Sequence, residues 1–216
     1  MSDTRFWLIR HGETQWNAAR RLQGWMDIPL STTGVEQATR LQGYLATPAF
    51  PSTIDVIVTS DLGRARETAR IAAGHLAIPL VSYPELRERS YGIYEGLDWA
   101  YLEGQDKGKA VIDFSDPAQD VEQGESLPVF YTRIQRAFED LAARHRGKNL
   151  LAFSHGGVVD MVWRRIHGVP LSAPRPAPIL NASVNAFSIS ADNAWTLGDD
   201  WGYVGHLTAP ALDDVV

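Results

Sequence analysis

Cysteine is absent from the 216-residue sequence, which excludes a disulfide-stapled scaffold and any metal site built from thiolates. No apolar run is long enough to span a bilayer, and the first five residues contain no apolar signal region. The net charge of −6 disfavours a nucleic-acid-binding surface, which requires a basic stripe. We therefore expect a cytoplasmic protein that binds neither nucleic acid nor membrane.

Motifs of two other enzyme classes are also missing. The sequence has no Gly-x-Gly-x-x-Gly loop after a strand, which dinucleotide-binding enzymes use, and no His-Glu-x-x-His, which zinc hydrolases use. Its histidines do not pair with acidic residues at the spacings of metal ligands. We expect neither a cofactor nor a metal.

Length and composition favour one domain that spans residues 1–216. The hydrophobic fraction of 44% is ordinary for a globular protein, and no linker, repeat or low-complexity tract divides the chain. Short apolar strands alternate with helical patterns along the sequence. We predict a three-layer α/β/α fold with a mostly parallel central sheet.

The first motif follows a short apolar run at the start of the chain. Phe6 to Ile9 predict a buried strand, which ends at Arg10, His11 and Gly12. In open α/β sheets, ligands bind outside the carboxyl ends of the strands, so we expect Arg10 and His11 to meet a ligand. Gly12 allows the backbone to come close to it.

A later segment repeats this arrangement. The apolar run 149–154 predicts a strand buried on both faces, followed by His155, Gly156 and a helix that extends to Ile166. Two strands that each deliver a histidine to one sheet edge are hard to explain as packing. His155 is therefore a second predicted site residue, and Gly156 a predicted phosphate contact.

Arg64 lies in the first turn of a predicted helix, after a strand over 54–58. A cation near a helix N-terminus opposes the helix dipole, and a bound anion removes this conflict. Arg64 is therefore a candidate phosphate ligand beside Arg10, although Arg66 and Arg70 suit an ordinary surface position equally well.

Two loops contribute further candidates. Asn17 precedes the glycine- and proline-punctuated loop 22–30, and its amide is suited to a phosphate oxygen, while Gly24 offers its backbone. The loop 84–96 contains three glutamates, and the residues alone do not choose among them: Glu85, Glu88 and Glu95.

Three further segments are expected to support the site. Residues 98–123 are polar and poorly periodic, so we predict an irregular, lid-like insertion. Glu125 precedes an amphipathic helix that begins at Leu127, and we predict that its carboxylate anchors basic residues of the site. Asn181 begins a late strand and is expected to brace the pocket.

The run Arg10-His11-Gly12-Glu13-Thr14 resembles the signature of the histidine phosphatase superfamily, in its phosphoglycerate-mutase-like branch. Ser60-x-Leu62-x-Arg64-Ala65 and Gly124-Glu125-Ser126 resemble further patterns of that family, and the resemblance covers nearly the whole chain. It implies that His11 is phosphorylated during turnover. It also implies that Glu88 is the proton donor and that Arg64 is the second arginine on the phosphate.

The resemblance leaves the activity open. Our first interpretation is a metal-independent phosphatase that acts on a small phosphorylated metabolite, with inorganic phosphate as product. The alternative is a cofactor-dependent phosphoglycerate mutase. It is disfavoured by Gly157 and because the sequence lacks the longer middle segment of the mutases, in which an Arg-Arg pair is followed by prolines. A third alternative is a silent phosphate-binding or regulatory protein. A homodimer is compatible with each.

Overall fold

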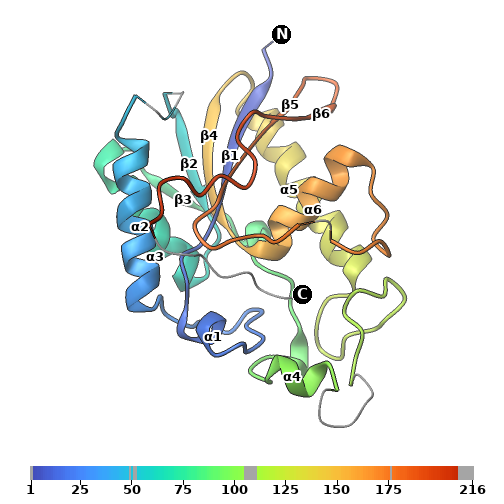
Figure 1. The fold of residues 1–216 in the computed structure, drawn as a ribbon. Coiled ribbons are helices and arrows are strands. Elements are labelled where there is room, and N and C mark those ends of the chain that lie inside the picture. Colours follow the sequence, from blue (N-terminus) through green and yellow to red (C-terminus); the bar gives the residue numbers. More distant parts are fainter. Residues whose placement is uncertain (1, 49, 51–52, 105–110, 176, 209–216) are drawn as a thin grey trace.

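Six strands form one sheet in the order β3-β2-β4-β1-β5-β6 (Figure 1). The computed structural model describes residues 2–48, 50, 53–104, 111–175 and 177–208. Strands β1 to β4 run parallel, and β5 and β6 are antiparallel to their neighbours. The strands are β1 (Thr4–Arg10), β2 (Val56–Thr59), β3 (Leu80–Ser82), β4 (Asn149–Ser154), β5 (Val184–Ile189) and β6 (Trp195–Leu197).

Helices cover both faces of this sheet, as Figure 1 shows, with α2 and α3 on one face and α5 and α6 on the other. The predicted three-layer, mostly parallel single-domain fold is therefore confirmed. No helix in the described part of the chain combines the length and apolarity needed to cross a bilayer. The helices are α1 (Gln15–Ala18), α2 (Thr32–Leu45), α3 (Gly63–Ala73), α4 (Trp99–Leu102), α5 (Leu127–Arg144) and α6 (Gly156–His167), with short 3₁₀ turns at Gly74–Leu76, Pro84–Leu86 and Gly92–Tyr94.

Strand β1 is apolar without alternation because it lies between two cores. Phe6 and Leu8 pack with α5 and α6, whereas Trp7 and Ile9 pack with α2 and α3. All four side chains are at most 5% exposed. A strand covered on both faces buries every side chain, which is why this run shows no polar face.

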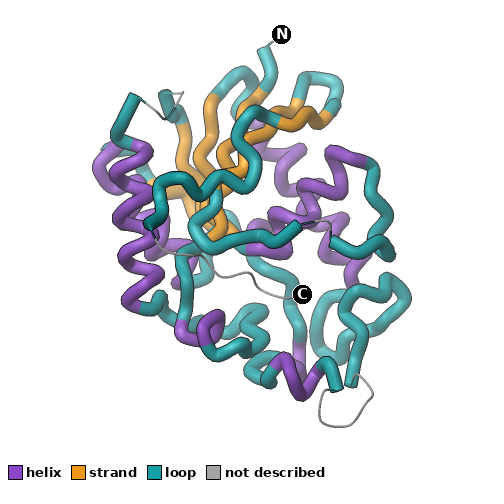
Figure 2. The backbone as a smooth tube through the Cα atoms, viewed as in Figure 1, coloured by secondary structure: helices purple, strands orange, loops and turns teal. Residues whose placement is uncertain are grey.

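The parallel pairing brings three strand ends to the same edge of the sheet. Arg10 of β1 is in register with Ser154 of β4, and Thr59 of β2 pairs with Phe153. Figure 2 shows that loops and the short helices α1 and α4 gather beyond this edge. Residues that directly follow these strands therefore meet at one place, as the sequence predicts.

The N-terminus of α2 differs from the sequence expectation. Capping-box spacing from Thr33 to Glu36 predicts a cap at Thr33, but the structure places the cap at Ser31. The Ser31 hydroxyl accepts a hydrogen bond from the Gly34 N–H at 3.1 Å. The prediction is wrong by two residues because several residues in this stretch are able to cap and only tertiary packing selects one.

The insertion 98–123 is less irregular than predicted. It contains α4, and its apolar side chains form a small core with Leu22 and Tyr91, comprising Trp99, Leu102, Ile112, Phe114 and Val121. Residues 105–110 lie outside the described residues. The sequence does not reveal this core because its members are spaced without a helix or strand period.

Glycine at position 34 is required by close packing of α2 on the first motif. A Cβ at Gly34 would lie 2.0 Å from the Glu13 carbonyl oxygen, whereas a Cβ at Gly43 in the same helix would meet nothing within 4 Å. We expect Gly34→Ala to lower the free energy of unfolding by about 1–3 kcal/mol. Gly43→Ala should raise it by about 0.5–1 kcal/mol through helix propensity.

Denaturant unfolding of the two variants beside the wild type measures both effects. Equal stabilisation by the two substitutions would show that the close approach to the Glu13 carbonyl does not require glycine at position 34.

Candidate active site

His11 and His155 follow β1 and β4 directly and lie side by side. Their ring centroids are 5.2 Å apart, and the side chains are 2% and 0% exposed. The His11 N–H donates to the Ser154 carbonyl at 2.9 Å, which continues the strand pairing. The structure therefore brings together the two predicted histidines.

The ring of His11 has a defined tautomer. Its Nδ1 lies 2.7 Å from the Gly12 carbonyl oxygen, which only accepts hydrogen bonds, so Nδ1 carries the proton. The lone pair is consequently on Nε2. Arg64 Nε donates to this atom at 3.2 Å.

Arg64 is 1% exposed, and backbone carbonyl groups hold its guanidinium. Its two terminal nitrogens donate to Gly24 at 2.7 Å and Met26 at 2.9 Å. Gly24 has φ +53°, a conformation that glycine adopts at little cost. Gly24 thus contributes by positioning Arg64.

Arg10 is fully buried on the other side of His11. Its Nη1 donates to the Ile179 carbonyl, and a Cβ at Gly156 would lie 3.4 Å from its Nε. Gly156 opens α6, whose N-cap residue, His155, makes no side-chain cap hydrogen bond. Asn181 donates to the His11 carbonyl at 3.1 Å and braces the pocket as predicted.

Both histidines are neutral in this site. Burial lowers the pKa of His11 well below its usual value, and the charges of Arg64 and Arg10 lower it further. Burial and Arg64 act in the same direction on the pKa of His155. A dianionic ligand would offset the arginine charges and raise both pKa values.

Glu88 is the glutamate that the structure places beside His11. Its two carboxylate oxygens accept from the N–H groups of Arg89 at 2.8 Å and Gly157 at 2.9 Å. A Cβ at Gly157 would lie 2.2 Å from the Glu88 carboxylate, so glycine there lets the glutamate approach α6.

The two competing glutamates have other roles. Glu85 is exposed, and its carbonyl accepts from Arg133 at 2.8 Å. The Glu95 carboxylate accepts from the N–H groups of Trp25 and Tyr91 and so fixes two loops to each other. Of the three, Glu88 alone lines the cavity at His11.

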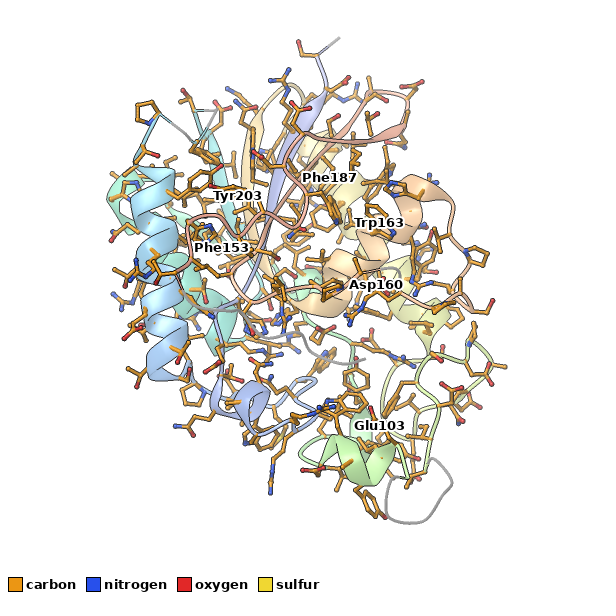
Figure 3. All side chains as sticks on the ribbon, in the orientation of Figure 1. Glu103, Phe153, Asp160, Trp163, Phe187 and Tyr203 are labelled. Atoms are coloured by element: carbon orange, nitrogen blue, oxygen red, sulfur yellow. The ribbon has the colours of Figure 1, made fainter. Side chains whose placement is uncertain are left out.

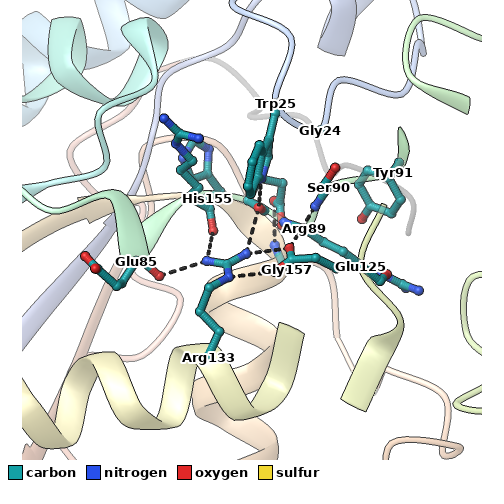
Figure 4. A network of polar contacts seen from close by, with 12 residues as sticks. Gly24, Trp25, Glu85, Arg89, Ser90, Tyr91, Glu125, Arg133, His155 and Gly157 are labelled. Carbon is teal, nitrogen blue, oxygen red and sulfur yellow. Dashed lines mark hydrogen bonds and ion pairs between the residues drawn. The ribbon is translucent and has the colours of Figure 1, made fainter. Parts of the chain in front are cut away.

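Arg133 of α5 holds the backbone that carries Glu88. It donates to the carbonyls of Glu85, Arg87 and Glu88 at 2.8 to 3.0 Å, as Figure 4 shows. Its guanidinium also pairs with both carboxylate oxygens of Glu125 at 2.6 and 2.7 Å. Glu125 therefore anchors Arg133, a basic residue that the sequence analysis did not single out.

Trp25 adds a second support to this loop, because its indole N–H donates to the Glu88 carbonyl at 2.7 Å. Neither Trp25 nor Arg133 is among the predicted site residues. The sequence carries no signal for Arg133, since a charged residue on an amphipathic helix is usually solvated.

Asn17 was predicted as a site residue, whereas Ser60 was not. The Asn17 amide oxygen accepts from the N–H and hydroxyl of Thr14 and caps α1, so a phosphate contact can come only from its amide nitrogen. Ser60 was not predicted, yet its hydroxyl lies 2.8 Å from His155 Nε2. Its signal was available, because Ser60 follows β2 as His11 follows β1.

The cavity at His11 has a volume of about 20 Å³, roughly the space of one water molecule. Among the residues that the structure describes, no three His, Asp or Glu side chains are placed to hold a metal ion. The lining residues are His11, Arg21, Leu22, Gln23, Gly24, Arg64, Glu88, Tyr91 and Trp99.

Comparison with known proteins agrees with this geometry. The family model "Histidine phosphatase superfamily (branch 1)" matches residues 6–198. The chain is 36% identical to phosphoglycerate mutase-like protein 4 of Arabidopsis thaliana, over 93% of this chain and 85% of that protein. It is 35% identical to a metal-independent phosphoserine phosphatase of the same plant, with 95% and 84% coverage.

Among solved structures, a mycobacterial glucosyl-3-phosphoglycerate phosphatase in complex with VO3 superposes with a TM-score of 0.79. It is 26% identical, and the match covers 93% of this chain and 99% of that chain. These similarities extend over nearly the full length of each protein.

The buried neutral histidines generate a pH dependence of stability. Because the pKa of each is lowered in the folded state, the unfolded chain binds more protons below about pH 6.5. The free energy of unfolding should therefore fall as pH decreases from 7 to 5, by up to about 1.4 kcal/mol per pH unit for each histidine.

Denaturant titration at several pH values measures this slope. His11→Asn and His155→Asn should each flatten it, and His75→Asn, at an exposed position, is the control. An unchanged slope in both site variants would contradict this account.

Proposed function

Because the chain belongs to branch 1 of the histidine phosphatase superfamily, we propose that it is a metal-independent phosphatase acting through a phosphohistidine. The observation that carries this proposal is the Nε2 lone pair of His11, fixed by the Nδ1 hydrogen bond to Gly12 and directed at Arg64. Such a lone pair is a nucleophile in an oriented position, next to a group that binds phosphate oxygens.

The proposed reaction has two displacements. Nε2 of His11 forms a bond to phosphorus while the bond to the leaving oxygen breaks, and protonated Glu88 gives its proton to that oxygen. Water then attacks the phosphohistidine, Glu88 takes a proton from the water, and inorganic phosphate leaves with His11 restored. Arg10, Arg64 and His155 stabilise the phosphoryl oxygens in both steps.

Hydrolysis is favoured over mutase activity by the small number of cations near the cavity. A phosphoglycerate mutase must bind a second anionic group of its substrate. Besides Arg64, the described lining contributes one cation, Arg21, while Arg89 donates to the carbonyls of Phe114 and Glu125. The phosphatase relatives support the same choice, whereas relatives named phosphoglycerate mutase or mutase-like keep the alternative open.

Gly157 no longer discriminates between these activities. The Glu88 carboxylate occupies the space of a Cβ at this position, so a local contact accounts for the glycine. A silent binding protein is disfavoured because His11, Glu88 and His155 are present together in one site. The proposed ligand is a small phosphorylated metabolite, and no step requires a metal or cofactor.

Rapid quenching with a ³²P-labelled phosphomonoester tests this function. We expect label on the protein that is lost in acid and stable in alkali, as a phosphoramidate behaves. His11→Ala should abolish label and turnover, and activity should survive EDTA.

A second assay distinguishes phosphatase from mutase activity. The rate at which inorganic phosphate forms from phosphomonoesters should be much higher than the rate of any interconversion of 3- and 2-phosphoglycerate. Fast interconversion that depends on 2,3-bisphosphoglycerate would instead establish a mutase.

The role of Glu88 predicts a dependence on the leaving group. Glu88→Gln should lower kcat by roughly 10²–10⁴-fold for an alkyl phosphate and less for p-nitrophenyl phosphate, whose leaving group needs no proton. Arg133→Met should show the same pattern at roughly ten- to hundredfold, since it releases the Glu88 loop. Inhibition by inorganic phosphate should stay unchanged in Arg133→Met.

The exposed Arg136 on the same helix provides the matched control, Arg136→Met, which should retain wild-type rates. Equal losses on the two substrates in Arg133→Met would indicate a general structural role in place of positioning of the acid.

A further inference from the structure

Two buried polar side chains beside the first motif, Gln37 and Thr68, take no part in the proposed reaction. They are 5% and 0% exposed, and neither is among the described residues that line the cavity at His11. Gln37 lies on α2 and Thr68 on α3, and these helices pack against each other on one face of the sheet, as Figure 3 shows. Buried polar side chains are normally hydrogen-bonded, and both of these bind the same short stretch of backbone.

Gln37 holds the peptide unit between Gly12 and Glu13. The Glu13 N–H donates to Oε1 of Gln37 at 2.8 Å. A trans peptide is planar, and its N–H and C=O point in opposite directions, so this bond also fixes the direction of the Gly12 carbonyl. That carbonyl is the group that accepts from Nδ1 of His11 at 2.7 Å. Gln37 is therefore one peptide plane away from the ring of His11.

Thr68 holds the preceding peptide unit, between His11 and Gly12. Its hydroxyl accepts from the Gly12 N–H at 3.0 Å and donates to the Arg64 carbonyl at 2.8 Å. A hydroxyl has one proton to donate, so the bond to Arg64 leaves the oxygen as the acceptor for Gly12. Thr68 thus ties the backbone at His11 to the turn of α3 that carries Arg64.

These contacts complete a ring of hydrogen bonds around the nucleophile. The Thr68 hydroxyl joins the backbone of Arg64 to that of Gly12. The Gly12 carbonyl binds Nδ1 of His11, and Nε2 of the same ring accepts from the Arg64 side chain. α2 also closes on this ring, because a Cβ at Gly12 would lie 2.5 Å from the Gly34 carbonyl oxygen. The direction of the Gly12 carbonyl is therefore set from both helices.

We propose that Gln37 and Thr68 are positioning residues for His11, which keep its proton on Nδ1 and its lone pair on Nε2 by fixing the two peptide units at Gly12. When the Gly12 carbonyl turns away, the tautomer protonated on Nε2 becomes accessible, and that ring has no lone pair on the atom that faces Arg64. The consequence for catalysis rests on the proposed function. The tautomer does not, because it is a property of the resting protein.

NMR of the full chain with ¹⁵N-labelled histidine tests the tautomer. Spectra at about pH 8, where histidine is neutral, distinguish the two tautomers, and His11→Asn identifies the signals of His11. The wild type should be protonated on Nδ1. Gln37→Met keeps the length of the side chain but lacks the amide oxygen, and it should raise the ratio of Nε2- to Nδ1-protonated ring at least about fivefold. Gln42→Met, at a half-buried position of the same helix, is the matched control and should not change this ratio.

Rapid quenching supplies the kinetic readout. Gln37→Met and Thr68→Val should slow the labelling of His11 roughly five- to fiftyfold, equally for an alkyl phosphate and p-nitrophenyl phosphate, because the nucleophile and not the acid is disturbed. Inhibition by inorganic phosphate should not weaken, since Arg10 and Arg64 remain. Thr68→Ser keeps the hydroxyl and should restore the rate to within about threefold of the wild type.

Three results would overturn the proposal. The wild type could show His11 protonated on Nε2, a result that does not depend on the folding of any variant. The slowed variants could keep the wild-type tautomer, which would indicate a general loss of stability. Gln42→Met could change the tautomer as much as Gln37→Met does. A wild type that takes up no label would contradict the proposed function, while the tautomer spectra would still decide the positioning role.

Discussion

The burial of two arginines and two histidines around one point is the constraint on which this structure depends. Arg10, Arg64, His11 and His155 are at most 2% exposed. Burial, followed by the charge of Arg64, lowers the pKa of both histidines and favours their neutral form. Under the proposed function, a phosphate dianion brings the compensating negative charge.

Backbone carbonyls make that burial possible. Arg64 donates to Gly24 and Met26, and Arg10 donates to Ile179, so part of each guanidinium is satisfied without a carboxylate. These carbonyl groups hold the two side chains in place at the sheet edge. This explains why the loops that follow β1 and precede β5 are tightly fixed at the sheet edge.

Other residues hold the loop that carries Glu88, residues 84–96. Arg133 and Trp25 bind its backbone carbonyls, and Gly157 donates to its carboxylate from the start of α6. These contacts come from α5, α6 and the loop after α1. The loop after α1 also holds Arg64 through Gly24 and Met26, and α6 begins at Gly156 beside His155. The elements that position Glu88 therefore also support the proposed phosphate ligands.

The sequence by itself determined the two buried strands, the two histidines that follow them and the arginine at the start of α3. These are local signals, because an apolar run and the residue that ends it are adjacent in the chain. The family resemblance selected Glu88 among the three glutamates, and the tertiary structure shows that Glu88 is the one that lines the cavity at His11. Only the tertiary structure placed Glu125 on Arg133 and revealed Ser60 beside His155. Those roles depend on contacts between elements far apart in the chain, and the periodicity of a single segment carries no information about which partner it meets.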